Sequence, residues 1–173
     1  METSVIKPRA TESGQELRIE PLADHVDKIP ILADWLYREW GYLEPQSSKE
    51  WVASRLAERL QRSTVPICFV ALNIRDETPR LVGTISVKFR EMELYPQLHY
   101  WVGSLLVEDS QRGQGIGSEL VRHVVAWGRE QRIETMHLYT KGQEGFYAAL
   151  GWQTIATPVY RGEATTVMRI SLS

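Results

Sequence analysis

The sequence predicts a mixed α/β fold with helices on the faces of a central sheet, and three observations carry this prediction. Stretches rich in β-forming residues alternate with stretches whose apolar residues recur at helical spacing, in the order β-α-α-β-β-β-α-β-α-β-β. The chain has 173 residues, 43% of them hydrophobic, which suits a single core. No internal repeat or low-complexity linker interrupts it. We therefore expect a flexible polar tail over residues 1–15 and a single domain over residues 16–173.

The first part of this domain is expected to contain one strand and two helices. Leu17–Leu22 alternates apolar with polar residues, which is typical of a strand. Pro30 fits the first turn of a helix, where its missing N–H costs little, and this helix is expected to end before Gly41. Residues 47–50 match a capping box, which predicts a second helix through about Arg62.

The middle of the chain is expected to contain three strands. Pro66–Leu72 is dense in β-forming residues. In Arg80–Phe89 the apolar residues alternate with polar ones such as Thr84 and Ser86. This alternation predicts one solvent-exposed face and hence antiparallel pairing. The third strand is expected from about His99 to Val107.

The last part of the chain is expected to alternate helices and strands. A helix is predicted by four apolar residues at helical spacing, namely Ile116, Leu120, Val124 and Trp127. The elements expected after it are a strand over Thr135–Thr140, a short helix over about Glu144–Leu150, a strand from Trp152 and a last strand over Thr165–Leu172.

Composition argues against several classes of protein. A formal net charge of −2 lacks the basic footprint of a duplex nucleic-acid binder. No apolar run approaches the about 20 residues of a membrane-spanning helix, and the start has no apolar segment typical of a secretory signal. The single cysteine, Cys68, fits a reducing compartment, and the four histidines lie far apart without a Cys/His cluster. We therefore expect a cytoplasmic protein with no metal, membrane or nucleic-acid partner.

The strongest chemical signal is a glycine-rich segment between the strand ending at Val107 and the following helix. A helix N-terminus presents unpaired N–H groups that attract phosphate, and glycines let the backbone approach a diphosphate closely. Arg112 adds a fork of donors. A G-x-G-x-x-G dinucleotide fingerprint fails because Ser118 or Leu120 occupies the third glycine position, and no lysine completes a P-loop. A nicotinamide cofactor is therefore disfavoured, whereas a plain strand-to-helix turn stays open as an alternative.

The remaining pattern, Arg112-x-x-Gly115-x-Gly117, resembles the pyrophosphate loop of the GCN5-related N-acetyltransferase (GNAT) superfamily. Leu105-x-Val107 precedes it at the family's spacing, and residues 145–152 (GFYAALGW) resemble the family's later FYxxxGF segment. The resemblance covers about residues 17–172. It implies a mostly antiparallel sheet of about six to seven strands flanked by about four helices, whose fourth and fifth strands splay apart. It also implies acetyl-CoA as co-substrate and an acyltransferase activity.

The resemblance also implies roles for named residues. Pantetheine would pair with the main chain of Leu105, Leu106 and Val107, where the Leu105 N–H would serve as oxyanion donor. The diphosphate would bind the loop residues Arg112, Gly113, Gln114, Gly115, Ile116, Gly117 and Ser118. Three further residues are expected to contact CoA, namely Thr140, where many relatives carry Asn, together with Gln143 and Tyr147. Tyr147 would also protonate the leaving thiolate, although a purely packing role for its ring is the alternative.

The general base is less well defined by the resemblance. Relatives often place Glu or His at a position that Trp101 occupies here, and an indole cannot take a proton. His99, two residues earlier, and Glu93, in the preceding loop, are candidates of equal rank; Glu91 is a further loop carboxylate. A non-catalytic acyl-CoA-binding sensor or interaction module is therefore the alternative function.

The acceptor is expected to be a primary amine, either a small molecule or a peptide N-terminus. In relatives it enters past the first two helices and the last strand pair, where this chain carries many aromatic residues. Aromatic faces beside carboxylates suit a cationic amine. Tyr42 and Glu44, between two expected helices, are the better pocket candidates, whereas Trp35 and Trp51 are expected in the core. A monomer or a homodimer is expected.

Overall fold

The structure is a computed structural model that describes residues 8–11, 13–75 and 77–173. The chain falls into two compact units. The first unit comprises the chain up to Ser86 together with Ser104–Val121, and the second comprises Val87–Gly103 and Arg122–Ser173.

The sheet of the first unit contains three antiparallel strands, β1 (Arg9–Ala10), β2 (Glu16–Pro21) and β3 (Ile67–Asn73). Next in hydrogen-bond order come β4 (Arg80–Lys88) and β5 (Trp101–Val107), each of which continues into the second unit. The strands predicted near residues 17, 66 and 80 are confirmed within one or two residues at each end. The β-branched and aromatic residues of β3 and β4 fill strands that are buried along most of their length.

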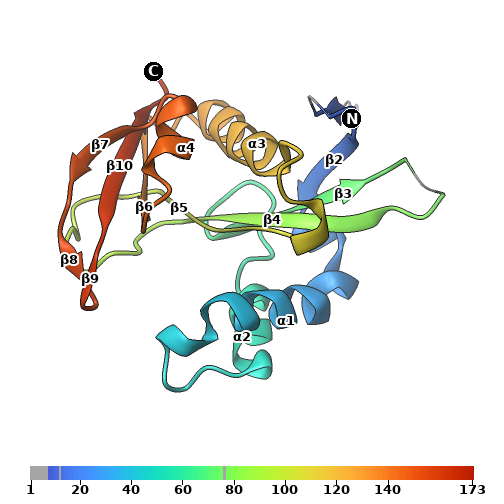
Figure 1. Ribbon diagram of the computed structural model, residues 1–173, viewed down its shortest axis with the longest axis horizontal. Coiled ribbons are helices and arrows are strands. Elements are labelled where there is room, and N and C mark those ends of the chain that lie inside the picture. Colours follow the sequence, from blue (N-terminus) through green and yellow to red (C-terminus); the bar gives the residue numbers. More distant parts are fainter. Residues whose placement is uncertain (1–7, 12, 76) are drawn as a thin grey trace. The chain divides into compact units, whose positions relative to one another are not determined.

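Two helices of the first unit, α1 (Ile29–Trp40) and α2 (Lys49–Ala57), pack side by side (Figure 1). Proline lies in the first turn of α1, and the helix ends before Gly41, as predicted. The second helix begins one residue later than the capping-box prediction, because the Ser48 hydroxyl accepts the hydrogen bond from the Trp51 N–H. It also ends five residues earlier than the predicted Arg62. The short 3-10 turns of this unit are Leu22–Asp24, Val26–Lys28, Gly41–Leu43 and Asp109–Gln111.

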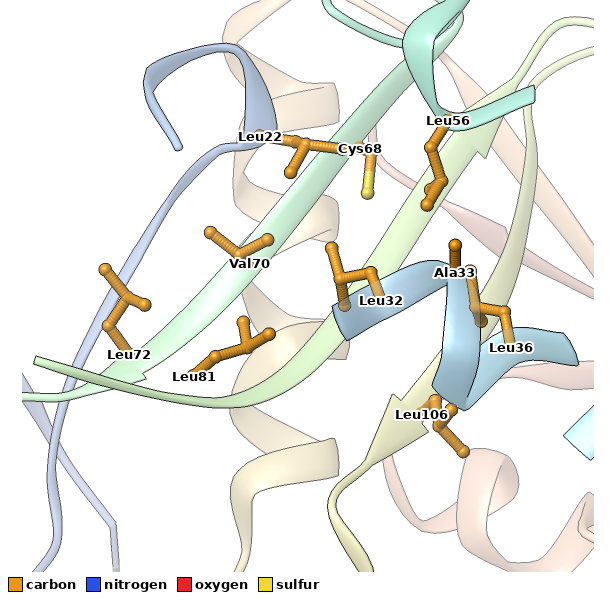
Figure 2. Packing of buried hydrophobic residues seen from close by; sticks show 10 residues of the cluster. All are labelled: Leu22, Leu32, Ala33, Leu36, Leu56, Cys68, Val70, Leu72, Leu81 and Leu106. Atoms are coloured by element: carbon orange, nitrogen blue, oxygen red, sulfur yellow. The ribbon is translucent and has the colours of Figure 1, made fainter. Parts of the chain in front are cut away.

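The core of the first unit lies between these helices and the strands, as Figure 2 shows. Leu32 and Leu36 of α1 meet Val70 of β3 and Leu106 of β5 in one apolar cluster. The full cluster is Leu22, Leu32, Ala33, Leu36, Leu56, Cys68, Val70, Leu72, Leu81 and Leu106. Burying a side chain of this size stabilises a fold by about 1.5–3 kcal/mol. The cluster therefore fixes α1 and α2 against the sheet.

The predicted solvent-exposed face of β4 is wrong, because Thr84 and Ser86 are both fully buried. Their hydroxyls form hydrogen bonds within the protein, and not with water as the alternation of polar and apolar residues had predicted. The Thr84 hydroxyl donates to the Phe69 carbonyl oxygen at 2.9 Å, and the Ser86 hydroxyl lies 3.2 Å from Arg59 Nη1. Because these hydroxyls are hydrogen-bonded inside the protein, polar residues can alternate with apolar ones in a strand that is buried on both faces.

The second unit has three antiparallel strands in the order β6 (Thr135–Thr140), β10 (Thr166–Ser171), β7 (Gln153–Ala156). β6 and β5 pair in parallel, and their register is recorded at one position, Trp101 opposite His137. A single paired position agrees with the expected splayed strands. The small helix α4 (Glu144–Ala149) is confirmed near its predicted bounds. A separate hairpin, β8 (Val159–Tyr160) with β9 (Glu163–Ala164), was not predicted.

The fold class is confirmed as mixed α/β with a mostly antiparallel sheet and one parallel pair. Among the described residues the sheet order is β1-β2-β3-β4-β5-β6-β10-β7, which is one strand more than the upper expectation. The additional strand is the two-residue β1, within the predicted tail. The third long helix, α3 (Ile116–Glu130), buries the four apolar residues that predicted it. No helix among the described residues has the length and apolar character needed to cross a membrane.

Two further predictions differ from the structure. Residues 9–11 and 13–15 form the end of β1 and a hydrogen-bonded turn instead of a frayed tail, whereas residues 1–7 and 12 lie outside the described residues. β5 begins at Trp101 instead of His99, because Tyr100 has a left-handed backbone with a φ of +57°. His99 therefore precedes the strand and shares no strand face with Trp101.

Candidate active site

The glycine-rich loop of the first unit leads from β5 into α3, as predicted. Gly113 and Gly115 have φ values of +75° and +81°, a left-handed conformation that favours glycine. The Gly115 carbonyl oxygen accepts the first hydrogen bond of the helix from the Glu119 N–H at 3.1 Å. The N–H groups of Ile116 and Gly117 come before the first helical donor, Glu119, so they lie at the positive end of the helix dipole without an intrahelical partner. This geometry suits an anion such as a diphosphate.

A third glycine brings the start of α3 close to the sheet of the first unit. A Cβ added to Gly83 of β4 would lie 2.9 Å from Leu120 Cδ1 and 3.1 Å from the Leu106 carbonyl oxygen. It would also lie 3.4 Å from Ile116 Cγ2. Only a residue without a side chain allows this approach. Gly83 therefore sets the distance between the head of the helix and β4.

The guanidinium of Arg112 lies among three acceptors of the first unit. Its Nε donates to the Val107 carbonyl oxygen at 3.2 Å. Its Nη2 lies 2.9 Å from a carboxylate oxygen of Asp109 and 3.7 Å from one of Glu39. About half of the Arg112 side chain is exposed. Exposed ion pairs contribute only about 0–1 kcal/mol, so an anionic ligand can replace the carboxylates at small cost.

The tip of the β1–β2 hairpin (Thr11 and Ser13–Gln15, hereafter the hairpin tip) contacts the same loop. The Ser13 hydroxyl donates to the Gln114 carbonyl oxygen at 2.9 Å. The Gln15 amide nitrogen donates to Gln111 Oε1 at 3.0 Å and also contacts Gln114 Oε1. Sequence analysis missed both residues because it assigned them to a polar tail.

The strand residues expected to pair with pantetheine have two environments. Leu106 is buried in the core of the first unit, whereas Leu105 and Val107 are half-buried. Immediately before them, Ser104 has a φ of +54°, which interrupts the extended backbone. Arg59 Nη1 donates to the Ser104 hydroxyl at 3.4 Å. Nothing in the local sequence pattern indicated that Arg59 supports this segment.

Tyr147, in the second unit, lies in α4 between two aromatic rings. The ring of Phe146 has its centroid 4.9 Å away and that of Trp152 lies 6.2 Å away, both at steep interplanar angles. Burial raises the pKa of the Tyr147 hydroxyl to about 12. No hydrogen-bond partner of this hydroxyl is found among the residues that the structure describes. The phenol therefore stays protonated at neutral pH and its proton is not committed to another side chain.

The two other residues expected to contact CoA lie in the same unit as Tyr147. Thr140 ends β6, where it is mostly buried and lies opposite Thr166 of β10. Gln143 is exposed immediately before α4, and its carbonyl oxygen accepts the Tyr147 N–H at 3.3 Å. Between them Gly142 has a φ of +86°, so the chain turns sharply from strand to helix.

The position at which relatives carry a base is part of the core in this chain. The Trp101 side chain is 1% exposed, and its indole N–H donates to the Leu98 carbonyl oxygen at 2.9 Å. It packs with Met92, Tyr160 and Val167 in the apolar cluster of the second unit. Trp101 therefore has a packing role, and neither face of its ring is available for proton transfer.

The candidate bases lie near this cluster in different surroundings. The ring of His99 stacks on Phe89 at 4.5 Å, and its carbonyl oxygen lies 2.7 Å from His137 Nδ1. Glu93 is exposed in the loop that follows β4. Glu91 is half-buried and forms an ion pair with Lys88 at 2.5 Å. The structure thus links His99 to His137, whereas it brings neither Glu93 nor Glu91 to that pair.

The aromatic residues of the elements past which the acceptor is expected to enter also fall into different environments. Tyr42 is 75% exposed, whereas Trp35 is partly buried against the core of the first unit. Trp51 is half-buried and stacks under the guanidinium of Arg55 at 5.8 Å. Tyr160, at the last strand pair, is buried in the second unit. Tyr42 is therefore the most accessible of these four aromatic residues.

Comparison with known proteins identifies the family of this chain. The acetyltransferase (GNAT) family matches residues 29–152, a span that includes the glycine loop and Tyr147. The chain belongs to the GNAT family of acetyltransferases.

Individual relatives and solved structures are similar to this chain over different shares of their length. It is 33% identical to mouse N-alpha-acetyltransferase 80 over 121 residues, which are 69% of this chain and 38% of that protein. The chain thus spans well under half the length of this curated relative. Its fold is similar to a crystal structure of aminoglycoside 6'-N-acetyltransferase complexed with coenzyme A (TM-score 0.67, 19% identity, 90% and 97% of the two chains). It is also similar to a chain of the NatC complex bound to Gag peptide and CoA (TM-score 0.66, 17% identity, 91% and 99%).

Proposed function

We propose that this protein transfers an acetyl group from acetyl-CoA to a primary amine by direct attack in a ternary complex. The observation that carries the proposal is the left-handed glycine loop at the head of α3, whose main chain can bind a diphosphate. Coenzyme A bound to the fold relative named above supports the same ligand class. The loop residues Arg112–Ser118 would hold the diphosphate, mainly through main-chain N–H groups.

The reaction makes three demands on the protein. An alkyl ammonium with a pKa near 10.4 is neutral in only roughly one molecule in 2,500 at pH 7, so the amine must lose a proton before it attacks. The amine nitrogen then bonds to the carbonyl carbon, whose oxygen gains negative charge and needs a donor. When the C–S bond breaks, the electron pair leaves on sulfur, and the thiolate accepts a proton from an acid.

We assign the acid to Tyr147. Its pKa of about 12 keeps the phenol protonated, and its hydroxyl has no competing partner among the described residues. As the thiolate leaves, the phenol proton passes to sulfur, the former amine nitrogen releases its second proton to solvent to give the neutral amide, and the phenolate is reprotonated from solvent. A phenol with a raised pKa is a weak acid, so a close hydrogen bond to the sulfur is required in the transition state.

We assign the oxyanion donor to the main-chain N–H of Leu105. The left-handed Ser104 precedes it, and such a residue re-aims the peptide group that follows. Pantetheine would pair with the main chain through Val107, as an added strand does. Thr140 and Gln143 would complete the contacts to CoA. Thr140 offers one hydroxyl where many relatives have an amide, so we expect a weaker contact there.

The base is proposed as Glu93 or His99, which keep equal rank. Glu93 is exposed and would act through a bound water, whereas His99 is half-buried with its ring on Phe89. Substituting each in turn, Glu93→Gln and His99→Gln, separates them. The true base is the residue whose loss removes the acidic limb of the pH–rate profile. If neither variant moves that limb, both assignments are wrong.

The acceptor class is proposed as small amines or peptide N-termini, since the names of the relatives include both kinds. Tyr42 and Glu44 are our candidates for its recognition. The test is release of free CoA from acetyl-CoA, measured with a thiol reagent across a panel of small amines and N-terminal peptides. We expect turnover with at least one class. Saturable CoA binding without turnover on any acceptor would contradict the assignment of an enzyme.

A second candidate function follows from the buried Trp101. Because this position cannot supply a base, the fold could bind acyl-CoA as a sensor or interaction module without catalysis. The two functions differ in one measurement. An enzyme consumes acetyl-CoA catalytically in the presence of its amine, whereas a sensor binds CoA stoichiometrically and releases it unchanged.

A further inference from the structure

The hairpin tip makes a set of polar contacts that the proposed chemistry does not require. Main-chain hydrogen bonds join its described residues: the Thr11 N–H donates to the Gln15 carbonyl oxygen at 2.9 Å and the Gly14 N–H donates to the Thr11 carbonyl oxygen at 2.8 Å. The Thr11 hydroxyl also accepts the Gln15 N–H at 3.0 Å. Short-range hydrogen bonds of this kind stiffen a turn. The tip therefore presents its side chains to the loop from a fixed backbone.

The Ser13 contact fixes one peptide plane of the loop. Its hydroxyl donates to the Gln114 carbonyl oxygen. In a trans peptide the N–H of the next residue points away from that carbonyl oxygen. The Gly115 N–H is therefore directed away from the hairpin tip, and no acceptor for it is found in the described part of the chain. Thr11 packs near the same residue, because a Cβ added to Gly115 would lie 3.8 Å from the Thr11 Cβ.

The side chain of Gln15 contacts residues on both sides of Arg112 and Gly113. Its amide nitrogen bonds the side-chain oxygens of Gln111 and Gln114, which flank Arg112 and Gly113. Gln15 itself is 7% exposed, and its own Oε1 is buried without a hydrogen-bond partner. A buried acceptor without a partner destabilises the fold. The two hydrogen bonds of the side-chain nitrogen therefore explain why the Gln15 amide has this orientation.

We propose that the hairpin tip is a clamp that holds the loop in its diphosphate-binding conformation, with Ser13 and Gln15 as positioning residues. This inference rests on the proposed function, because it takes the ligand of the loop to be the diphosphate of CoA. Without the clamp, Gly113 and Gly115 leave the loop free to sample many conformations, and each binding event must then order it. The clamp acts on the affinity for CoA and leaves the acyl-transfer step unchanged.

The test compares the full chain with Ser13→Ala, Gln15→Ala and the double variant. Gln153→Ala, which removes an exposed glutamine from β7, is the matched control. Affinity is measured for CoA and for S-acetylpantetheine, which lacks the diphosphate. We expect the Kd for CoA to rise about three- to tenfold for each single variant and further for the double variant. The Kd for S-acetylpantetheine and the kcat at saturating acetyl-CoA should stay within about twofold.

A second readout needs no ligand. Backbone order parameters of residues 113–118, measured by NMR relaxation in the free protein, should be lower in the double variant than in the wild type or Gln153→Ala. Equal order parameters and an unchanged Kd for CoA in a folded double variant would overturn the clamp. Equal loss of CoA and S-acetylpantetheine affinity would also overturn it, because the effect would then not concern the diphosphate. If the wild type binds no CoA, the proposed function fails, and the diphosphate assignment of the clamp fails with it.

Discussion

The two units of this protein carry different kinds of group for the proposed chemistry. In the first unit, the loop before α3 offers main-chain N–H groups, and its residues matter for the backbone conformation that they allow. In the second unit, Tyr147 offers one hydroxyl held among aromatic rings. The difference teaches that binding can be distributed over many peptide groups, whereas proton transfer depends on a single atom. Changes in the glycine loop should therefore alter affinity, and changes at Tyr147 should alter rate.

The largest effect is expected from Tyr147→Phe, which removes the proposed acid and keeps the ring. We expect kcat to fall roughly 10²- to 10⁴-fold, because the thiolate then leaves without a positioned proton donor. The Kd for CoA should stay within about twofold, because binding rests on the loop. Steady-state kinetics with the best acceptor and titration with CoA measure the two quantities.

The matched control is Tyr160→Phe, which removes a phenol hydroxyl from the buried cluster of the same unit. It should leave kcat within about twofold. A Tyr147→Phe enzyme with wild-type kcat would show that the ring only packs, and Tyr147 would then have no role in catalysis.

Gly115→Val tests the proposal that the glycine loop of the first unit binds CoA. Its φ of +81° is strained for any L side chain, and most of all for a β-branched one, so the loop must change conformation. We expect the Kd for CoA to rise at least about tenfold, with a smaller change in kcat at saturation. Calorimetric titration with CoA provides the measurement.

Gly162→Val is the control for strain alone. Gly162 has a φ of +80° in the β8–β9 turn, and nothing lies within 4 Å of a Cβ placed there. It should lower stability by a similar amount and leave CoA affinity unchanged. If Gly115→Val binds CoA as the wild type does, the diphosphate does not bind at this loop.

A smaller effect distinguishes the two ends of α3. Gly83→Ala places a Cβ against the Leu106 carbonyl oxygen, which cannot move freely, so we expect a loss of about 1–3 kcal/mol in the free energy of unfolding. Gly128→Ala meets the ends of flexible side chains, Leu172 Cδ1 at 2.8 Å and Met136 Cε at 2.9 Å. Alanine also favours the helix by about 1 kcal/mol at this position, so the net change should be near zero. Chemical denaturation of both variants measures the difference, and equal losses would contradict it.

The smallest effect concerns the buried His137. Burial lowers its pKa below the ordinary 6.5, although the hydrogen bond with the His99 carbonyl oxygen opposes this. The unfolded chain therefore takes up the proton first as the pH falls, and stability is lost below about pH 6.5. Denaturation between pH 5 and 8 should show a weaker pH dependence for His137→Gln than for the wild type. An identical dependence would mean that other groups account for the acid sensitivity.

Local patterns were sufficient for elements whose residues carry their own signal. The strand Thr135–Thr140 has its predicted bounds, and α3 follows from four apolar residues that face one side. The glycine loop could be located because a left-handed backbone favours glycine over other residues. In each case the determining interactions lie within a few residues along the chain.

Other features depend on partners far away in the sequence. Ser13 and Gln15 look like tail residues because their partners, Gln114 and Gln111, lie 101 and 96 residues further on. Similarly, Thr84 looks solvent-exposed until the carbonyl oxygen of Phe69 satisfies its hydroxyl. No periodicity of the local chain encodes such contacts, so they require the folded structure.

The two carboxylates beside Arg112, those of Asp109 and Glu39, outnumber this cation at the mouth of the loop. Nucleic acids and free polyphosphates depend on unshielded cations, and ionic strength controls their binding steeply. This loop offers them little attraction. A ligand gains contacts on which salt has little influence if it binds the peptide groups of the glycine loop and also extends along β5. Discrimination among anions thus resides in the main chain.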